Sequence, residues 1–261
     1  MINAIQYQGQ KTNSQAEVSE LLNTFFVEIG PNLSRNVANV DTTYEEFLCA
    51  TTKEFIFEKT TTAHILSLLS KLCKSKATGL DKISAKLLKE CPDLIAESLT
   101  LIFNQSLSTG IFPDEWKSAR VTPLYKNSGK RNDPTNYRPI SVIPVVAKVF
   151  ERVVYDQLYH YLTENCIISP YQSGFCSLHS TVTALLEATD SWAMNIDRIL
   201  VNAVIFLDLK KAFDTVDRNI LLTKLQCYEL RSSCHEWFTL YLSNRTQTCL
   251  INTSMSTPEI S

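Results

Sequence analysis

One short stretch limits what this chain can fold into more than any other. Four apolar residues, Val204 to Leu207, are followed directly by Asp208. Two lysines, an Ala-Phe pair and a second carboxylate, Asp214, come within the next six positions. A continuous apolar run of this length is typical of a strand that is buried on both faces. A carboxylate at the end of such a strand is held at a rigid and dry position, which suits a metal ion. We therefore expect a sheet with Asp208 at the end of one of its strands.

Helical periodicity dominates the rest of the chain. Apolar residues recur every three or four positions in several segments, which predicts helices at 14–29, 61–74, from about Ser84, and at 93–109, 145–163, 181–196, 218–228 and 233–242. Alternating or extended patterns predict strands at 117–126, 137–143 and 246–252. This mixture predicts an α+β fold, rich in helix with a few antiparallel strands, and not a regular βαβ alternation.

Two of these segments carry more detailed expectations. Gly30-Pro31 should end the first helix, and the Thr-rich residues 32–60 should then form a linker with little structure of its own. The helix at 181–196 should turn one apolar stripe toward the interior. The residues of that stripe are Val182, Leu185, Leu186, Trp192 and Ile196.

The charge of the chain is distributed unevenly. The net charge is −2, which by itself argues against a nucleic-acid-binding protein. Residues 1–60 hold four Lys/Arg and eight Asp/Glu, whereas residues 117–152 hold eight Lys/Arg and two acidic residues, a local net charge of +6. A basic stretch of this kind can bind phosphates even in a slightly acidic chain. On charge alone, an ordinary solvated surface explains the stretch equally well.

Cysteine usage and hydropathy indicate the compartment. None of the eight cysteines forms a C-x-x-C pair, and most fall inside helical or strand patterns, so we expect reduced thiols in the core. The first ten residues are polar, and no apolar run approaches the roughly 20 residues that cross a bilayer. These features predict an intracellular protein, nuclear or cytoplasmic, without a membrane anchor.

The carboxylates near Asp208 leave several interpretations open. Two-metal phosphoryl transfer needs at least two carboxylates that share cations roughly 3.5–4 Å apart. Asp208 is well placed to be one of them, although a strand-end turn residue is an equal alternative. Asp214 follows a turn, so its side chain should point elsewhere. Asp217 precedes a helical pattern, and for it we favour a role as the N-cap.

The motif around Asp208 resembles a motif of a known protein family. Residues 206–216, Phe-Leu-Asp-Leu-Lys-Lys-Ala-Phe-Asp-Thr-Val, resemble the first catalytic motif of reverse transcriptases from non-LTR retrotransposons. Other blocks resemble further segments of that family in the same order, at 76–88, 116–126 with 136–141, 172–175 and 237–245. Residues 22–30 resemble the segment that joins endonuclease and polymerase in jockey-like or CR-type elements. The likeness covers about residues 60–252.

The resemblance implies a role for individual residues. Asp208 would hold catalytic Mg²⁺ ions, and the backbone around Leu209 would face a metal or the triphosphate. Phe213 would lie under the sugar and select deoxynucleotides. Two cations, Lys126 and Arg138, would pair with the incoming triphosphate. Three further residues would contact the template and the incoming base, with the glycine allowing close backbone approach. These are Gln172, Gly174 and Phe175.

The resemblance also implies an architecture and a limit. The family fold would place an amino-terminal helix and linker at 1–60, polymerase fingers at 61–185 and part of the palm at 186–261, with no thumb. The partners would be an RNA template, a DNA primer and deoxynucleoside triphosphates. The family motif Tyr-x-Asp-Asp supplies the remaining metal carboxylate, and this sequence contains no Asp-Asp pair. We therefore expect the chain alone to be inactive as an RNA-directed DNA polymerase. The alternative is a remnant or exapted fragment that binds nucleic acid without catalysis.

Overall fold

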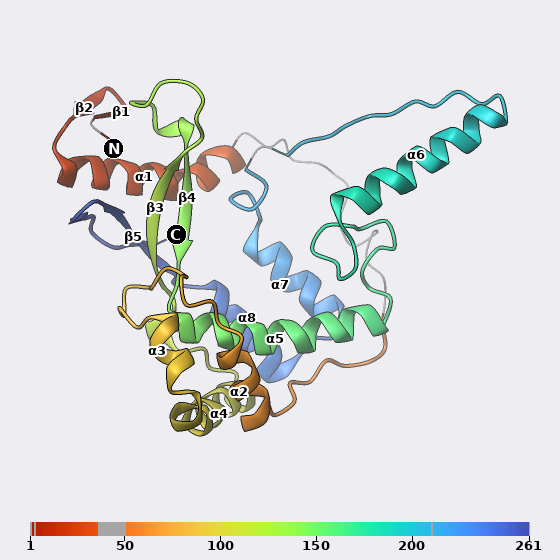
Figure 1. Cartoon of the computed structure of the whole chain (residues 1–261), viewed down its shortest axis with the longest axis horizontal. Coiled ribbons are helices and arrows are strands. Elements are labelled where there is room, and N and C mark those ends of the chain that lie inside the picture. The colour runs from red at the N-terminus through yellow and green to blue at the C-terminus, as the bar shows by residue number, and fades with distance from the viewer. Residues whose placement is uncertain (1, 3, 36–50, 210, 261) are drawn as a thin grey trace.

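A five-stranded sheet forms one half of the molecule. The computed structural model describes residues 2, 4–35, 51–209 and 211–260. The strands run in the order β4 (Tyr137–Val142), β3 (Ser118–Tyr125), β5 (Thr246–Ile251) and β6 (Ser254–Met255), and β7 (Glu259–Ile260) also pairs with β5. Strands β3 and β4 are antiparallel, whereas β3 and β5 are parallel. Figure 1 shows β3 and β4 as a long ribbon that rises from the helices.

A cluster of helices forms the other half and contains the larger core. Its members are α2 (Thr62–Ser70), α3 (Ala85–Glu90), α4 (Pro92–Thr109), α5 (Val145–Glu164), α7 (Arg218–Cys227) and α8 (Ser232–Leu242). Aromatic rings from several of these helices meet in the centre. Phe103 stacks on Phe150 with a centroid distance of 4.4 Å, and the indole of Trp237 lies edge-on to Phe150 at 5.5 Å. The buried Trp237 Nε1 donates a hydrogen bond to Ser106 Oγ at 3.1 Å, so its polar atom is satisfied.

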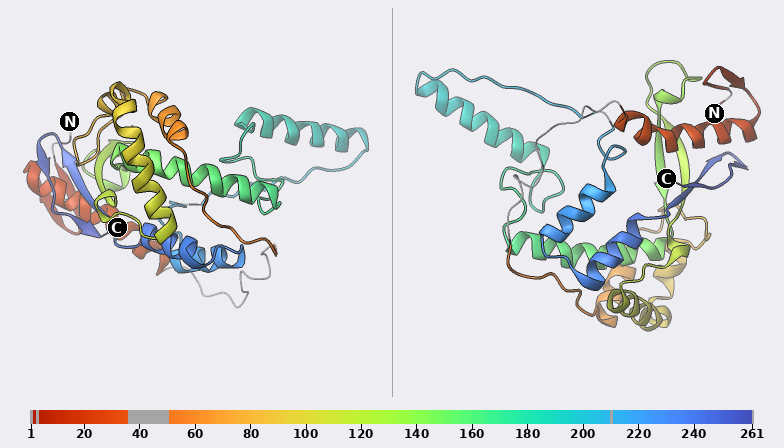
Figure 2. Two further views of the ribbon diagram at one scale, coloured as in Figure 1. Left: turned by 90° about the horizontal axis from the view of Figure 1, so that it is seen from below. Right: turned by 180° about the vertical axis from the view of Figure 1, so that it is seen from behind.

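The amino-terminal helix packs against the sheet and forms a second core. Helix α1 (Gln15–Ser34) follows a small hairpin of β1 (Ile5–Tyr7) and β2 (Gln10–Thr12). Its apolar side chains, Leu22 and Phe26 among them, share a cluster with Val121 of β3 and Cys249 of β5. Figure 2 shows from two further sides that α1 lies across the strands. Residues near the two ends of the chain therefore lie side by side.

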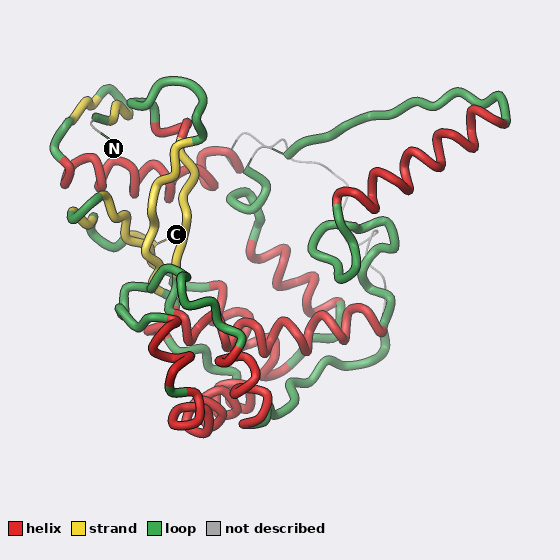
Figure 3. The backbone as a smooth tube through the Cα atoms, viewed as in Figure 1, coloured by secondary structure: helices red, strands yellow, loops and turns green. Residues whose placement is uncertain are grey.

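Most of the predicted helices and strands are confirmed, because their signals are local. Ser84 caps α3 by accepting a hydrogen bond from Leu87 N, and Asp217 caps α7 by accepting from Asn219 N and Ile220 N. The mixture of helix and strand in Figure 3 confirms the α+β class. The expectation of antiparallel strands holds for β3 with β4 but was wrong for β3 with β5, which run parallel. The β1–β2 hairpin and the short strands β6 and β7 were not predicted, because they are too brief to carry a periodic pattern.

Two local predictions about the amino-terminal region were wrong. Helix α1 does not end at Gly30-Pro31 but continues to Ser34. Packing of α1 on the sheet outweighs the loss of one backbone hydrogen bond at Pro31. Part of the expected linker, residues 36–50, lies outside the described residues. The remainder is not a free linker, because Phe55 is 4 % exposed in the helical core and pairs with Leu230 through a parallel β-bridge.

The prediction of a buried strand ending at Asp208 was also wrong. Residues 200–209 form no strand, and the side chains of Ile205, Phe206 and Leu207 are 84–89 % exposed. A strand needs a neighbour to satisfy its backbone groups, and among the described residues none pairs with this segment. An apolar run therefore indicates burial only where a partner strand is available.

The expected inward stripe on the preceding helix was wrong for the same reason. Helix α6 (Thr181–Asp197) extends away from the rest of the molecule (Figure 1). It has no buried residue; Val182 is 65 % exposed and Leu185 is 58 % exposed. Leu186 and Ile196 are exposed as well, and Trp192 is only partly buried. The amphipathic pattern predicted the helix but not its packing partner.

Candidate functional site

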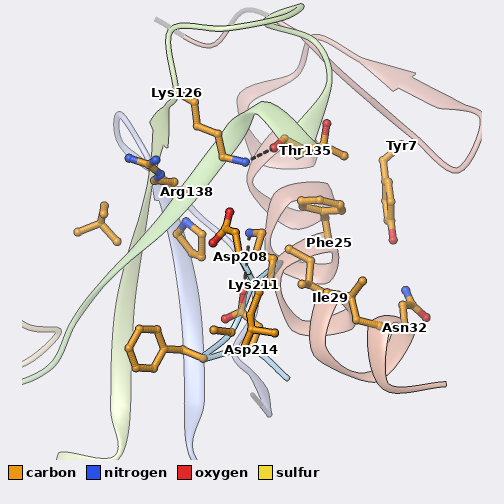
Figure 4. Close-up of a pocket in the computed structure, with 16 residues that line it drawn as sticks. Tyr7, Phe25, Ile29, Asn32, Lys126, Thr135, Arg138, Asp208, Lys211 and Asp214 are labelled. Carbon is orange, nitrogen blue, oxygen red and sulfur yellow. Dashed lines mark hydrogen bonds and ion pairs between the residues drawn. The ribbon is translucent and has the colours of Figure 1, made fainter. Parts of the chain in front are cut away.

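Three separate parts of the chain enclose one cavity of about 820 Å³. This volume lies within the range of small-molecule binding sites. Figure 4 shows the β3–β4 ribbon on one side, α1 on another, and Asp208, Lys211 and Asp214 between them. The lining residues from α1 and its hairpin include Tyr7, Phe25, Ile29 and Asn32; those from the ribbon include Lys126, Thr135 and Arg138; those from the motif include Asp208, Leu209, Lys211, Phe213 and Asp214.

The register of the ribbon brings two of the predicted cations together. Leu124 pairs with Arg138, and the backbone N–H of Lys126, the residue just past the end of β3, donates to Asn136 O at 2.8 Å. Lys126 and Arg138 therefore lie near each other at one end of the ribbon, and both line the cavity. The Lys126 Nζ donates a hydrogen bond to the carbonyl oxygen of Thr135 at 2.7 Å, which holds the ammonium at the cavity (Figure 4).

A third cation, Lys211, comes from the motif itself. Its ammonium lies 3.7 Å from the Asp214 carboxylate. Burial lowers the pKa of Lys211, Asp214 raises it, and Lys126 and Arg138 lower it further. Lys126, Arg138 and Lys211 all line the same cavity, so the three positive charges share one region. A region of this kind favours a polyanion.

The carboxylates of the cavity differ in their partners. Asp214 is paired with Lys211, and it lines the cavity, contrary to the expectation that it points elsewhere. Asp208 also lines the cavity and is solvent-exposed. Among the described residues there is no group of three or more His, Cys, Asp or Glu side chains that could hold a metal ion. This donor set fits a Mg²⁺ ion that takes one carboxylate and completes its shell with substrate phosphates, a common arrangement for that ion.

The structure places the remaining predicted residues unequally. Leu209 and Phe213 both line the cavity. The ring of Phe175 packs edge-on against Phe213 with a centroid distance of 6.0 Å, so one of the three predicted template residues reaches the cavity wall. Gln172 and Gly174 do not line it; Gln172 Nε2 donates to Gly174 O at 3.2 Å within an exposed loop.

Sequence reasoning missed the contribution of α1 and of Lys211. Lys211 lies inside the recognised motif, and its position between Asp208 and Asp214 was the available signal. For α1 the signal was absent. An amphipathic pattern shows that Phe25 and Ile29 should be buried, but nothing in it indicates that they face a motif about 180 residues later in the sequence.

The structure is that of an α+β protein in which one cavity brings two carboxylates and three cations together, a lining that suits a polyanionic ligand. The family model for reverse transcriptase (RNA-dependent DNA polymerase) matches residues 126–258, which is half of the chain. The chain belongs to this family, and its resemblance to the reverse transcriptases of non-LTR retrotransposons is confirmed. Enzymes of this family generally use divalent metal ions.

Individual relatives agree with this assignment. The chain is 31 % identical over 190 residues to the RNA-directed DNA polymerase from mobile element jockey of Drosophila melanogaster, a match that covers 69 % of this chain and 20 % of that protein. It is 30 % identical over 162 residues to the probable RNA-directed DNA polymerase from transposon BS of the same organism, covering 62 % of this chain and 18 % of that protein. The chain thus spans about a fifth of the length of the curated relatives it matches.

None of the helices in the described part of the chain combines the length and the apolar character needed to cross a bilayer.

Proposed function

We propose that the cavity binds the triphosphate of a deoxynucleoside triphosphate, and that the chain is part of an RNA-directed DNA polymerase. The observation that carries the proposal is the convergence of Lys126, Arg138 and Lys211 on a cavity that also contains Asp208. Cations in this arrangement offset the charge of the phosphates as the transferred group develops more of it. The template would be RNA and the primer DNA, and such an enzyme would act inside the cell, in the nucleus or the cytoplasm.

Each residue has a distinct task in this proposal. Asp208 holds Mg²⁺, which, when bound, supplies charge neutralisation at the phosphates and activation of the primer hydroxyl. Lys126 and Arg138 hold the triphosphate, and the backbone at Leu209 lies beside it. Phe213 stands under the sugar and leaves no room for a 2′-hydroxyl. Phe175 braces that ring from the far side, while Gln172 and Gly174 contact the template.

The proposed architecture follows the same family pattern. Residues 61–185 would correspond to the fingers and residues 186–261 to part of the palm, preceded by the amino-terminal helix and linker at 1–60. We propose that this chain alone binds nucleotide without extending a primer. Asp214 is engaged with Lys211, which leaves Asp208 as the one motif carboxylate free to hold a metal among the described lining residues. A second carboxylate is required for the two-metal reaction.

Nucleotide binding is the first experiment. A fluorescent deoxynucleoside triphosphate with Mg²⁺ would be titrated with the chain and with the double variant Lys126→Gln/Arg138→Gln. The matched control carries Lys86→Gln and Lys59→Gln, which removes the same charge at sites away from the cavity. We expect the first pair to weaken binding by about 100-fold or more, since hydrogen bonds to charged groups contribute roughly 1.5–3 kcal/mol each. An equal loss of nucleotide affinity in both double variants would overturn the assignment of the cavity as the nucleotide site.

Primer extension on poly(rA)/oligo(dT) with Mg²⁺ or Mn²⁺ separates activity from binding. The proposal expects no incorporation by the chain alone. Clear incorporation that is abolished by Asp208→Ala would show that the chain is catalytically competent.

The second candidate, a nucleic-acid-binding fragment without catalysis, rests on the basic stretch 117–152. A salt titration of RNA binding distinguishes it. This candidate would be favoured if RNA affinity falls steeply with salt and no nucleotide binding is found. The slope of log affinity against log salt concentration counts the counterions that are released on binding.

A further inference from the structure

Helix α1 lies outside the segment that matches the reverse transcriptase family, yet it forms a wall of the cavity. We infer that α1 is a positioning element of the nucleotide site, and that Gly30 is the residue through which it fixes the turn at 211–216. The inference rests on the proposed function for its consequence on nucleotide binding. The contact between α1 and the turn can be tested without it.

One end of α1 is anchored firmly to the sheet. The fully buried Asn23 donates from Nδ2 to Thr257 O at 3.0 Å and accepts from Gln247 Nε2 at 3.1 Å. Glu20 accepts hydrogen bonds from the backbone N–H and the hydroxyl of Thr257, at 2.8 Å and 2.9 Å. These bonds, with the apolar cluster beneath them, fix the rotation and the register of the helix on β5 and its neighbours.

The hairpin before α1 braces it from the cavity side. The hydroxyl of Tyr7 donates to Glu28 Oε2 at 2.7 Å, and Gln8 Nε2 donates to the same oxygen at 3.1 Å. Tyr7 also packs edge-on against Phe25 with a centroid distance of 5.1 Å. The helix wall at the cavity is therefore held from two directions.

The other end of α1 meets the motif at very close range. A Cβ atom placed on Gly30 would clash with the carbonyl oxygen of Asp214, a backbone atom that cannot rotate away. Only glycine permits this approach. The turn lies between two hollows on this helix, one lined by Phe25 and Ile29 and the other by Phe26 and Val27.

The turn is compact, so a shift at Asp214 moves it as a unit. Asp214 N donates to Lys211 O at 2.9 Å, the Lys211 ammonium pairs with the Asp214 carboxylate, and Thr215 Oγ1 donates to Ala212 O at 3.1 Å. The residues before it, up to Leu209, lack a strand neighbour among the described residues. The contact at Gly30 therefore holds Lys211 and Phe213 in place at the cavity.

The direction of the effect of Gly30→Ala distinguishes this inference from helix propensity alone. Alanine is the better helix former, so helix propensity alone predicts that Gly30→Ala stabilises α1. The close contact predicts instead that the added methyl group displaces the turn. We expect Gly30→Ala to weaken nucleotide binding by about tenfold or more, because displacement of the turn moves the Lys211 ammonium away from the triphosphate. Hydrogen exchange should rise in peptides that cover 208–217 and stay unchanged in α4.

The control is Gln15→Ala, a change to alanine at an exposed position of the same helix. It should leave both the exchange pattern and the nucleotide affinity unchanged. If Gly30→Ala prevents folding, Val27→Ala removes apolar atoms from the hollow that Val27 and the turn line together, without adding an atom, and it should raise exchange at 208–217 to a smaller extent. Unchanged exchange at 208–217 in folded Gly30→Ala protein overturns the inference. Absence of nucleotide binding by the unaltered chain overturns the proposed function, while the exchange result still decides the role of Gly30.

Discussion

The polar contact between α1 and the carboxyl-terminal strands offers a quantitative test of the fold. Asn23 is 0 % exposed, and its amide joins Gln247 and Thr257 across a buried boundary. Replacing it by alanine removes two hydrogen bonds at 3.0 Å and 3.1 Å and a longer one to Gln247 O at 3.5 Å. The substitution also leaves the side-chain amide of Gln247, which is only 8 % exposed, without the Asn23 Oδ1 acceptor. A buried donor left unpaired costs roughly 1–3 kcal/mol, so we expect a loss of about 2–4 kcal/mol.

Hydrogen exchange measured by mass spectrometry reports this loss where it occurs. A loss of about 2–4 kcal/mol corresponds to exchange that is faster by roughly 30- to 1000-fold in α1 and β7, if these elements open together. The matched control is Ser19→Ala. Ser19 is equally buried on the same helix, but its hydroxyl donates locally, to Ala16 O at 2.7 Å. Its loss should therefore cost about 1 kcal/mol or less.

The comparison between the two variants decides the matter. If Asn23→Ala accelerates exchange in α1 no more than Ser19→Ala does, the long-range amide contacts contribute nothing beyond an ordinary buried polar group. The account of how α1 is anchored would then be wrong, whatever the absolute rates.

Three further predictions concern the core, the pH dependence and the cavity. Trp237→Ala should lower the free energy of unfolding by about 3–5 kcal/mol in urea denaturation, because the side chain is 1 % exposed and packed among aromatic rings; a loss below 1 kcal/mol would contradict this packing. Burial raises the pKa of Glu151 in the folded chain, although its hydrogen bond with Tyr241 opposes the shift. The folded state then holds this proton more tightly than the unfolded state, so stability should fall as pH rises from about 4.5 through the raised pKa, and Glu151→Gln should flatten that slope. Unfolding in urea at a series of pH values measures it, and identical slopes would refute the assignment. If Phe213 stands under the sugar, Phe213→Val should narrow the preference for deoxy- over ribonucleoside triphosphates in parallel binding titrations, whereas an unchanged ratio would remove the residue from that role.

Local signals in the sequence were sufficient for most elements and for part of the site. The cap at Ser84 and the apolar stripe of α5 each depend on neighbours a few residues away, and both are read directly from the chain. The family resemblance named Lys126 and Arg138, and the ribbon of β3 and β4 brings both to the cavity. The family motif then identified Asp208 and Phe213 as parts of the same site.

The errors share one physical origin. Val204 to Leu207 and the stripe on α6 have the composition of buried segments, but burial requires a surface that covers them, and composition does not supply one. Conversely, the packing of α1 on β5 depends on the hydrogen bond between Asn23 and Gln247, two residues that are 224 positions apart in the sequence. Such contacts lie outside any local pattern. Roles for the template residues Gln172 and Gly174 stay predictions, because their loop lies away from the cavity.

The anchoring of α1 by the last strands has a consequence for synthesis of the chain. The partners of Glu20 are 237 positions away, so the helix emerges from the ribosome long before they exist. At the usual rate of about 5–20 residues per second, that delay is roughly 12–50 s. During this time Leu22, Phe25 and Phe26 have no sheet to cover them, and the helix is a natural substrate for a chaperone. The cavity that α1 helps to line can form only after translation has passed β7, so it is among the last features of this chain to form.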